Sequence, residues 1–208
     1  MSPTWALREI PTTLGPARIH RCTPRGSARA PVIVLGHGAG GGVDAPDLQA
    51  LAAAATSHGF RVVLVEQPWR LAGRRIAPRP EALDDGWVQV LTALRIRGPL
   101  IVGGRSAGAR VACRTAGKVG AVAVVCLAFP LHPPGRPDRS RAAELEAVDV
   151  PVVAIQGDRD AFGSAAELRE AAPGVAVVPV IGGDHGLARG ALAPAIEEAL
   201  ELLRAGME

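Results

Sequence analysis

The chain has 208 residues, of which 48% are hydrophobic and 21% charged, as in a globular protein with a substantial core. The net charge is +3, but no dense basic run with interleaved aromatic residues occurs, so nucleic-acid binding is not expected. The N-terminus lacks the pattern of a signal peptide, and the longest apolar run, residues 119–129, is too short to span a membrane. We therefore expect a cytoplasmic protein with one domain over residues 1–208 and no membrane contact.

Short apolar runs alternate with Ala- and Leu-rich segments along the chain. Residues 5–10 and 17–22 are expected to form a lead-in hairpin, and residues 67–80 an irregular stretch. The other expected strands cover residues 32–35, 60–66, 121–128, 150–155 and 175–181, with one more starting near residue 100. The expected helices cover residues 47–58, 81–94, 139–147, 164–172 and 189–204, with another after the strand near residue 100. This alternation with short loops predicts an α/β fold with a doubly wound, mostly parallel sheet flanked by helices.

Residues 99–112 are the most informative stretch, because an apolar strand, a glycine cluster and an Ala-rich helix follow one another there. Within it, Gly104-Arg105-Ser106-Ala107-Gly108 matches the G-x-S-x-G pattern, which holds a nucleophilic serine on a sharp strand-to-helix turn. The flanking glycines let the strand and the helix pass close to each other. The Ala107 N–H lies at the helix N-terminus, where unpaired donors favour an oxyanion. The stretch predicts Ser106 as a nucleophile and Ala107 as an oxyanion donor.

Polar residues follow two later strands, at the edge where parallel strands place their carboxyl ends. Asp158 and Asp160 come after the strand at residues 150–155, and His185 comes after the strand at residues 175–181. His185 would take the proton from Ser106, and an aspartate would hold its ring in the required tautomer. We prefer Asp160 for that aspartate, with Asp158 as the alternative. Asp184 is a third candidate, but its position next to His185 in the chain makes an orienting hydrogen bond awkward.

A second glycine-rich stretch, residues 36–42, follows the strand at residues 32–35. The second oxyanion donor must come from a loop of this kind, and we expect the Ala39 N–H, with Gly40 in reserve. The same stretch also fits G-x-G-x-x-G, and Glu66 ends the next strand about 25 residues later, which leaves a Rossmann oxidoreductase using a nicotinamide cofactor as an alternative. Against this alternative, Pro46 delays the following helix, and the later serine, aspartate and histidine motifs would all be coincidences.

These motifs, in this order, resemble the α/β-hydrolase superfamily, and within it the compact dienelactone-hydrolase-like branch. The resemblance implies Ser106, Asp160 and His185 as nucleophile, acid and base. The chain differs from the dienelactone hydrolases proper in carrying serine rather than cysteine at the sharp turn. More narrowly, residues 103–106 (Gly-Gly-Arg-Ser) and 72–75 (Ala-Gly-Arg-Arg) resemble a subfamily that includes a testis-expressed protein and a subunit of a histone acetyltransferase complex. Some of its eukaryotic members look like scaffold proteins, so a non-catalytic interaction domain is a second hypothesis.

The segment between the strands at residues 121–128 and 150–155 has only about 20 residues, too few for a large cap. We therefore expect an open site that hydrolyses a small carboxylic ester or thioester through an acyl-serine intermediate, without a metal or organic cofactor. The three cysteines are far apart and have no metal-ligand spacing, so Cys113 and Cys126 are expected in the core. The sequence does not define an oligomeric state. Candidate substrate contacts are His37, Gly40, Trp69, Arg105 and Phe162, and His37 is expected to stabilise its loop rather than to act as a general base. Trp87 could also line the pocket, although packing explains the tryptophans and the phenylalanine equally well.

Overall fold

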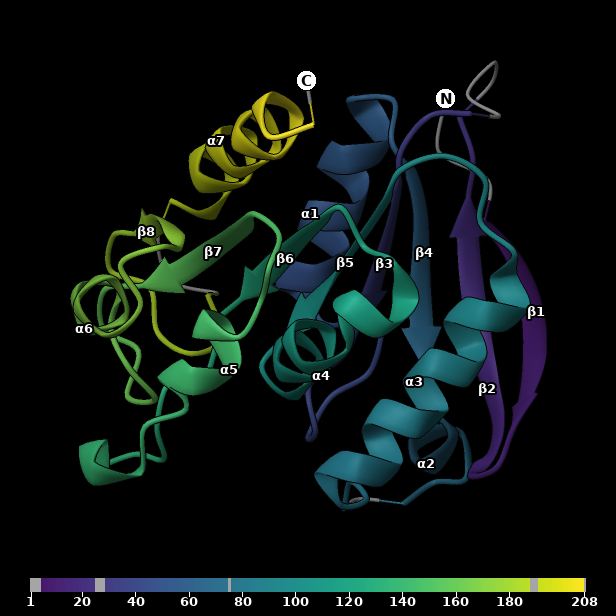
Figure 1. Cartoon of the computed structure of the whole chain (residues 1–208), viewed down its shortest axis with the longest axis horizontal. Helices are drawn as coiled ribbons and strands as arrows, with labels where there is room; N and C mark the ends of the chain where they lie inside the picture. Colours follow the sequence, from purple (N-terminus) through teal and green to yellow (C-terminus); the bar gives the residue numbers. More distant parts are fainter. Residues whose placement is uncertain (1–4, 25–28, 75, 188–190, 208) are drawn as a thin grey trace.

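The structure is a computed structural model that describes residues 5–24, 29–74, 76–187 and 191–207. Its strands form one sheet in the order β1-β2-β4-β3-β5-β6-β7-β8 (Figure 1). β1 pairs antiparallel with β2 and β2 with β4, and every other neighbouring pair is parallel. The strands are β1 (Trp5–Thr12), β2 (Gly15–Cys22), β3 (Val32–Gly36), β4 (Arg61–Glu66), β5 (Leu100–Arg105), β6 (Ala123–Leu127), β7 (Val152–Gly157) and β8 (Ala176–Val180). The doubly wound, mostly parallel sheet is confirmed, and so is the lead-in hairpin.

Helices cover both faces of the sheet, with α1 and α7 on one face and α3, α4 and α5 on the other (Figure 1). Their bounds are α1 (Pro46–Ser57), α2 (Pro68–Leu71), α3 (Pro80–Leu94), α4 (Ala107–Thr115), α5 (Ala142–Glu146), α6 (Ala165–Ala171) and α7 (Leu192–Ala205). Between β6 and β7 the described chain forms only a 3-10 turn at Pro137–Arg139 and the short helix α5, so no large lid is present. No helix within the described ranges has the length and apolar character needed to cross a bilayer.

The expected helices differ from the observed ones in three places. Residues 67–80, expected to be irregular, include α2, where Pro68 starts a single short turn. The helix expected at residues 139–147 is interrupted, because Ser140 is extended between the 3-10 turn and α5. The helix expected from residue 189 is described only from Leu192, and residues 188–190 lie outside the described ranges.

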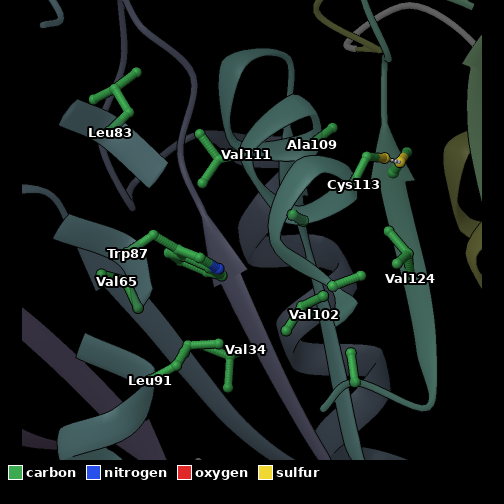
Figure 2. Packing of buried hydrophobic residues seen from close by; sticks show 14 of the residues in the cluster. Val34, Val65, Leu83, Trp87, Leu91, Val102, Ala109, Val111, Cys113 and Val124 are labelled. Carbon is green, nitrogen blue, oxygen red and sulfur yellow. Dashed lines mark hydrogen bonds between the residues drawn. The ribbon is translucent and has the colours of Figure 1, made fainter. Parts of the chain in front are cut away.

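The apolar face of α3 packs over the central strands and forms much of the core on that side (Figure 2). Trp87 is fully buried, and its ring lies 3.2 Å from the point where a Cβ on Gly36 would stand. Trp87 is therefore a core residue and not a pocket lining. Cys113 of α4 and Cys126 of β6 are also buried, with their Sγ atoms 3.6 Å apart, although they are distant in sequence.

Candidate active site

The turn between β5 and α4 holds Ser106 in a strained backbone conformation. Its φ of 51° and ψ of −110° lie in a region that residues other than glycine rarely adopt, at a cost of about 1–3 kcal/mol. A Cβ on Gly104 or Gly108 would stand 2.3 or 2.4 Å from the Gly36 carbonyl oxygen, so only glycine fits at either position. The Ser106 N–H donates to the Leu127 carbonyl at 2.9 Å, which ties the turn to β6. Strand, turn and helix thus hold the serine at the carboxyl edge of the sheet.

Three side chains from separate loops form a continuous series of hydrogen bonds at this edge. His185 Nε2 lies 3.0 Å from Ser106 Oγ, and His185 Nδ1 lies 2.8 and 3.1 Å from the two carboxylate oxygens of Asp160. With the proton on Nδ1, the ring donates to Asp160 and accepts from the serine hydroxyl. The Asp160 side chain is fully buried, whereas Asp158 is exposed and makes no side-chain contact with His185. Of the two aspartates, Asp160 is the one that contacts the histidine.

Close backbone contact between the loops after β7 and β8 brings Asp160 to His185. A Cβ on Gly157 would stand 2.4 Å from the Gly183 carbonyl oxygen, and the Arg159 N–H donates to that same oxygen at 3.0 Å. Glycine at position 157 is therefore required for the two loops to meet.

Gln156, near the end of β7, contacts Asp160, and the sequence analysis did not include it among the candidate site residues. It is fully buried, and its Nε2 lies 3.1 Å from Asp160 Oδ2, while the Phe162 N–H donates to Asp160 Oδ1 at 2.8 Å. These two donors, one to each carboxylate oxygen, hold the carboxylate of Asp160 in place beside His185. The available signal was an amide side chain that ends an otherwise apolar strand just before Gly157.

Phe162 and Asp184 complete the surroundings of His185. The Phe162 ring centroid lies 4.2 Å from that of His185, at an interplanar angle of 32°, and the phenylalanine is half-buried. Asp184 Oδ1 accepts from the Gly186 N–H at 3.0 Å, so this carboxylate shapes the turn that carries the histidine. Phe162, a predicted substrate contact, therefore lies beside His185.

The loop after β3 presents backbone donors to the same edge. The Gly41 N–H donates to the Gly38 carbonyl at 3.3 Å, and this turn leaves Ala39 and Gly40 exposed at its tip. Within the described ranges, the N–H groups of Ala39, Gly40 and Ala107 have no hydrogen-bond acceptor. Free donors from two loops are thus available to a negatively charged oxygen.

His37 was expected among the substrate contacts, but it lies beneath this loop and is only 1% exposed. Its Nδ1 lies 2.9 Å from the Gly38 carbonyl oxygen, and its Nε2 accepts from the Gln67 N–H at 3.0 Å. Trp69, the second of these expected substrate contacts, is also buried, with its ring centroid 5.2 Å from that of His37. Both residues are buried under the loop rather than open to a substrate, and His37 has the loop-stabilising position that the sequence also suggested.

The buried His37 predicts how stability depends on pH. Burial lowers the pKa of His37 below its ordinary value of 6.5, and this outweighs the hydrogen bond to Gly38 and the charge of Glu66. The unfolded chain therefore binds more protons than the folded one just below that value, and stability contributed by neutral His37 falls as the pH drops through 6.5. We expect His37→Gln to lower the free energy of unfolding by roughly 1–2 kcal/mol at pH 7.5, and by less at pH 5.5. Urea unfolding of both proteins at the two pH values measures this difference, and a difference that grows at low pH would contradict the assignment.

Arg105 was also expected to contact substrate, but its guanidinium is engaged within the protein. Arg105 Nε donates to Asp47 Oδ2 at 2.8 Å, and Nη2 donates to the His185 carbonyl oxygen at 2.9 Å. A Cβ on Gly38 would stand 2.9 Å from Arg105 Nη1, so the side chain also passes against the loop after β3. Burial raises the pKa of Asp47, and the Arg105 charge opposes that shift. Arg105 therefore links α1, the loop after β3 and the histidine loop, and we assign it a positioning role.

Arg105→Lys tests this role, because lysine keeps the positive charge near Asp47 but has a single nitrogen in place of the two that reach Asp47 and the His185 carbonyl. We expect kcat to fall about tenfold, since even a 1 Å displacement of a catalytic group is costly, and KM to stay within about twofold. Steady-state kinetics on an activated ester separate the two parameters. A raised KM with an unchanged kcat would instead mean that Arg105 binds substrate, as the sequence suggested.

The features expected of a Rossmann cofactor site are not assembled here. Glu66 pairs with Arg18 and His20 of β2, at 3.7 and 3.6 Å, so its carboxylate is engaged by side chains of that strand. The loop leads into a turn, and α1 starts only at Pro46. Within the described residues, no group of three or more His, Cys, Asp or Glu side chains could hold a metal ion.

The sheet order, with its antiparallel hairpin at one edge and the strained serine turn after β5, defines an α/β-hydrolase fold. A model of the alpha/beta hydrolase domain family matches residues 29–198, and the chain belongs to that family.

Three solved structures illustrate the likeness, all at identities that show the fold alone. A serine hydrolase without lid from Xanthomonas campestris has a TM-score of 0.75 at 20% identity, covering 99% of this chain and 96% of its own. A serine hydrolase homologue from Coxiella burnetii has a TM-score of 0.78 at 18% identity, covering 95% of this chain and 97% of its own. A dienelactone hydrolase from Anabaena variabilis has a TM-score of 0.77 at 18% identity, covering 98% of each chain.

Proposed function

We propose that this chain is a serine hydrolase that cleaves small carboxylic esters or thioesters through an acyl-Ser106 intermediate. The observation that carries the proposal is the unbroken hydrogen-bonded series from Ser106 through His185 to Asp160, on a strained turn beside free backbone donors. A core or loop serine has no need of such an arrangement, whereas nucleophilic catalysis requires it.

In this mechanism, Ser106 Oγ attacks the carbonyl carbon while His185 Nε2 takes the hydroxyl proton. The Asp160 carboxylate stabilises the imidazolium that forms. The Ala107 and Ala39 N–H groups, with Gly40 in reserve, donate to the oxyanion of the tetrahedral intermediate. His185 then gives its proton to the leaving alcohol or thiol. A water molecule activated by the same histidine releases the acid, and no metal or organic cofactor enters these steps.

The short connection between β6 and β7 supports small acyl groups as substrates, because no large lid is present to enclose a long chain. The likeness to a dienelactone hydrolase supports an ester-like carbonyl, although the serine at position 106 separates this chain from cysteine enzymes. We further propose that it acts in the cytoplasm as a single domain over residues 1–208. Its place in the narrower testis-expressed and acetyltransferase-subunit group stays a proposal, and Arg75 of that motif lies outside the described residues.

A panel of p-nitrophenyl esters and acyl thioesters tests the proposed reaction. We expect acetyl and butyryl substrates to be turned over faster than dodecanoyl ones, because an open site offers little apolar wall to a long chain. Ser106→Ala, assayed in parallel, measures any hydrolysis that does not depend on the serine. Absence of turnover above that variant for every substrate, with the wild type folded, would favour the non-catalytic interaction domain instead.

A further inference from the structure

Several arginines line two adjoining cavities at the end of the sheet where the central strands begin, opposite the end that carries Ser106. One cavity, of about 260 Å³, is lined by Arg21, Arg61, Arg95 and Arg97 together with Val32 and Leu94. The other, of about 420 Å³, shares Leu94 and Arg95 and adds Arg8. They lie where β3, β4 and β5 begin and α3 ends, whereas Ser106 follows the carboxyl end of β5. Because β5 runs through Arg105, a strand length of roughly 20 Å separates this place from the serine.

The charge around these cavities is not balanced within the protein. No aspartate or glutamate lines either cavity. Within the described ranges, none of the five arginines named above has a carboxylate within ion-pair distance. Arginines elsewhere in the chain do pair, among them Arg105, Arg110 and Arg114. Other described arginines, such as Arg79 and Arg139, also lack a carboxylate partner, so what distinguishes this place is that four unpaired arginines line one cavity.

Arg61 gives the strongest indication of an anion site, because it is a buried cation and no carboxylate lies within ion-pair distance of it among the described residues. It starts β4 and is only 5% exposed. Its Nε donates to the Ala30 carbonyl at 2.9 Å and its Nη2 to the Arg97 carbonyl, so neutral oxygens are its acceptors. Burial lowers the pKa of Arg61, and the charge of Arg21 lowers it further. A buried charge is costly unless an opposite charge compensates it, and a bound anion would supply that charge.

We propose that these cavities bind an oligophosphate group, either free or carried by a nucleotide. The guanidinium fork matches phosphate oxygens in a bidentate manner, and several arginines around one space suit a ligand with several negative charges. The adjoining volumes exceed what a single phosphate ion fills and accommodate a short chain of phosphates. Arg21, Arg95 and Arg97 are exposed and unpaired within the described residues, so their side chains can turn onto such a ligand.

Isothermal titration calorimetry with sodium tripolyphosphate tests the site. The cavity variant is Arg21→Gln/Arg97→Gln, which removes two exposed charges and leaves the buried Arg61 in place. The matched control is Arg79→Gln/Arg139→Gln, which removes the same net charge from exposed positions that line neither cavity. We expect saturable binding to the wild type, a dissociation constant raised about tenfold or more in the cavity variant, and a change of less than about twofold in the control.

Titrations with pyrophosphate and ATP distinguish a free oligophosphate from one carried by a nucleotide. Pyrophosphate should bind more weakly than tripolyphosphate, because it meets fewer arginines, and higher salt should weaken both. Equal affinity for ATP and tripolyphosphate would assign recognition to the phosphates alone, whereas tighter ATP binding that is also lost in the cavity variant would add a nucleoside. Lack of saturable binding by the wild type, or an equal loss in both double variants, would overturn the proposal.

Discussion

Ser106→Ala is expected to lower kcat for ester hydrolysis by about 10⁶-fold, the effect that loss of the nucleophile has in serine hydrolases. The expectation follows from the 3.0 Å contact between Ser106 Oγ and His185 Nε2, since no other hydroxyl is described within reach of that nitrogen. Stopped assays with an activated ester at high protein concentration measure the residual rate.

The control for this variant is Ser140→Ala, which removes an exposed hydroxyl that accepts from the Ala142 N–H and is not a partner of His185. Its kcat should match that of the wild type. Circular dichroism and thermal unfolding establish that both variants are folded. Activity of Ser106→Ala within about tenfold of the wild type would assign the reaction to another nucleophile.

Asp160→Asn is expected to lower kcat by about 10⁴-fold, with little change in the overall fold. The carboxylate accepts from His185 Nδ1, from the Phe162 N–H and from Gln156 Nε2. An amide of the same shape cannot accept at all these positions, so it turns an N–H toward a donor or leaves His185 in the wrong tautomer. In the wrong tautomer the ring proton is on Nε2, which can then no longer accept the proton of Ser106.

Asp158→Asn is the matched control, because it makes the same chemical change two residues away at an exposed side chain. We expect its kcat to stay within about twofold of the wild type, because surface substitutions away from the reacting groups rarely matter. Comparable losses of kcat in the two variants would mean that Asp160 alone does not supply the carboxylate that His185 needs. A loss confined to Asp158→Asn would contradict the role of Asp160.

Much of the fold could be predicted because its signals are local. The central strands are continuous runs of Val, Ile and Leu, as buried parallel strands require, and the turn at Ser106 carries its own glycine pattern. The short helix α2 was missed because it is a single turn, too short to show any periodicity. The break before α5 was missed because an extended Ser140 leaves no mark in an otherwise helical composition.

The site was predictable as a set of motifs but not as a set of side-chain directions. Strand ends in a parallel sheet meet at one edge, so Ser106, His185 and an aspartate near position 160 could be expected together. The loop geometry that buries Asp160 and exposes Asp158 depends on contacts with Gly183, which no spacing in the sequence reveals. For the same reason, Arg105 looked like a substrate contact, although it is directed at Asp47 and the His185 carbonyl.

Strain at Ser106 connects stability with the proposed activity. The backbone conformation there is maintained by the close approach of Gly104 and Gly108 to Gly36 and by the hydrogen bond to Leu127. α4 is held in turn by ion pairs from Arg110 and Arg114 to carboxylates of the neighbouring helices. A rigid support of this kind keeps the serine hydroxyl in place without further cost during the reaction.

Labelling with a fluorophosphonate probe tests the central claim most directly, because the probe reacts with an activated serine whatever the natural substrate is. Intact mass and peptide mapping of the folded wild type should reveal a single adduct on Ser106. The adduct should be absent from Ser106→Ala and form far more slowly in Asp160→Asn than in Asp158→Asn. No adduct on Ser106 in the folded wild type, or equal labelling of other serines, would contradict the account.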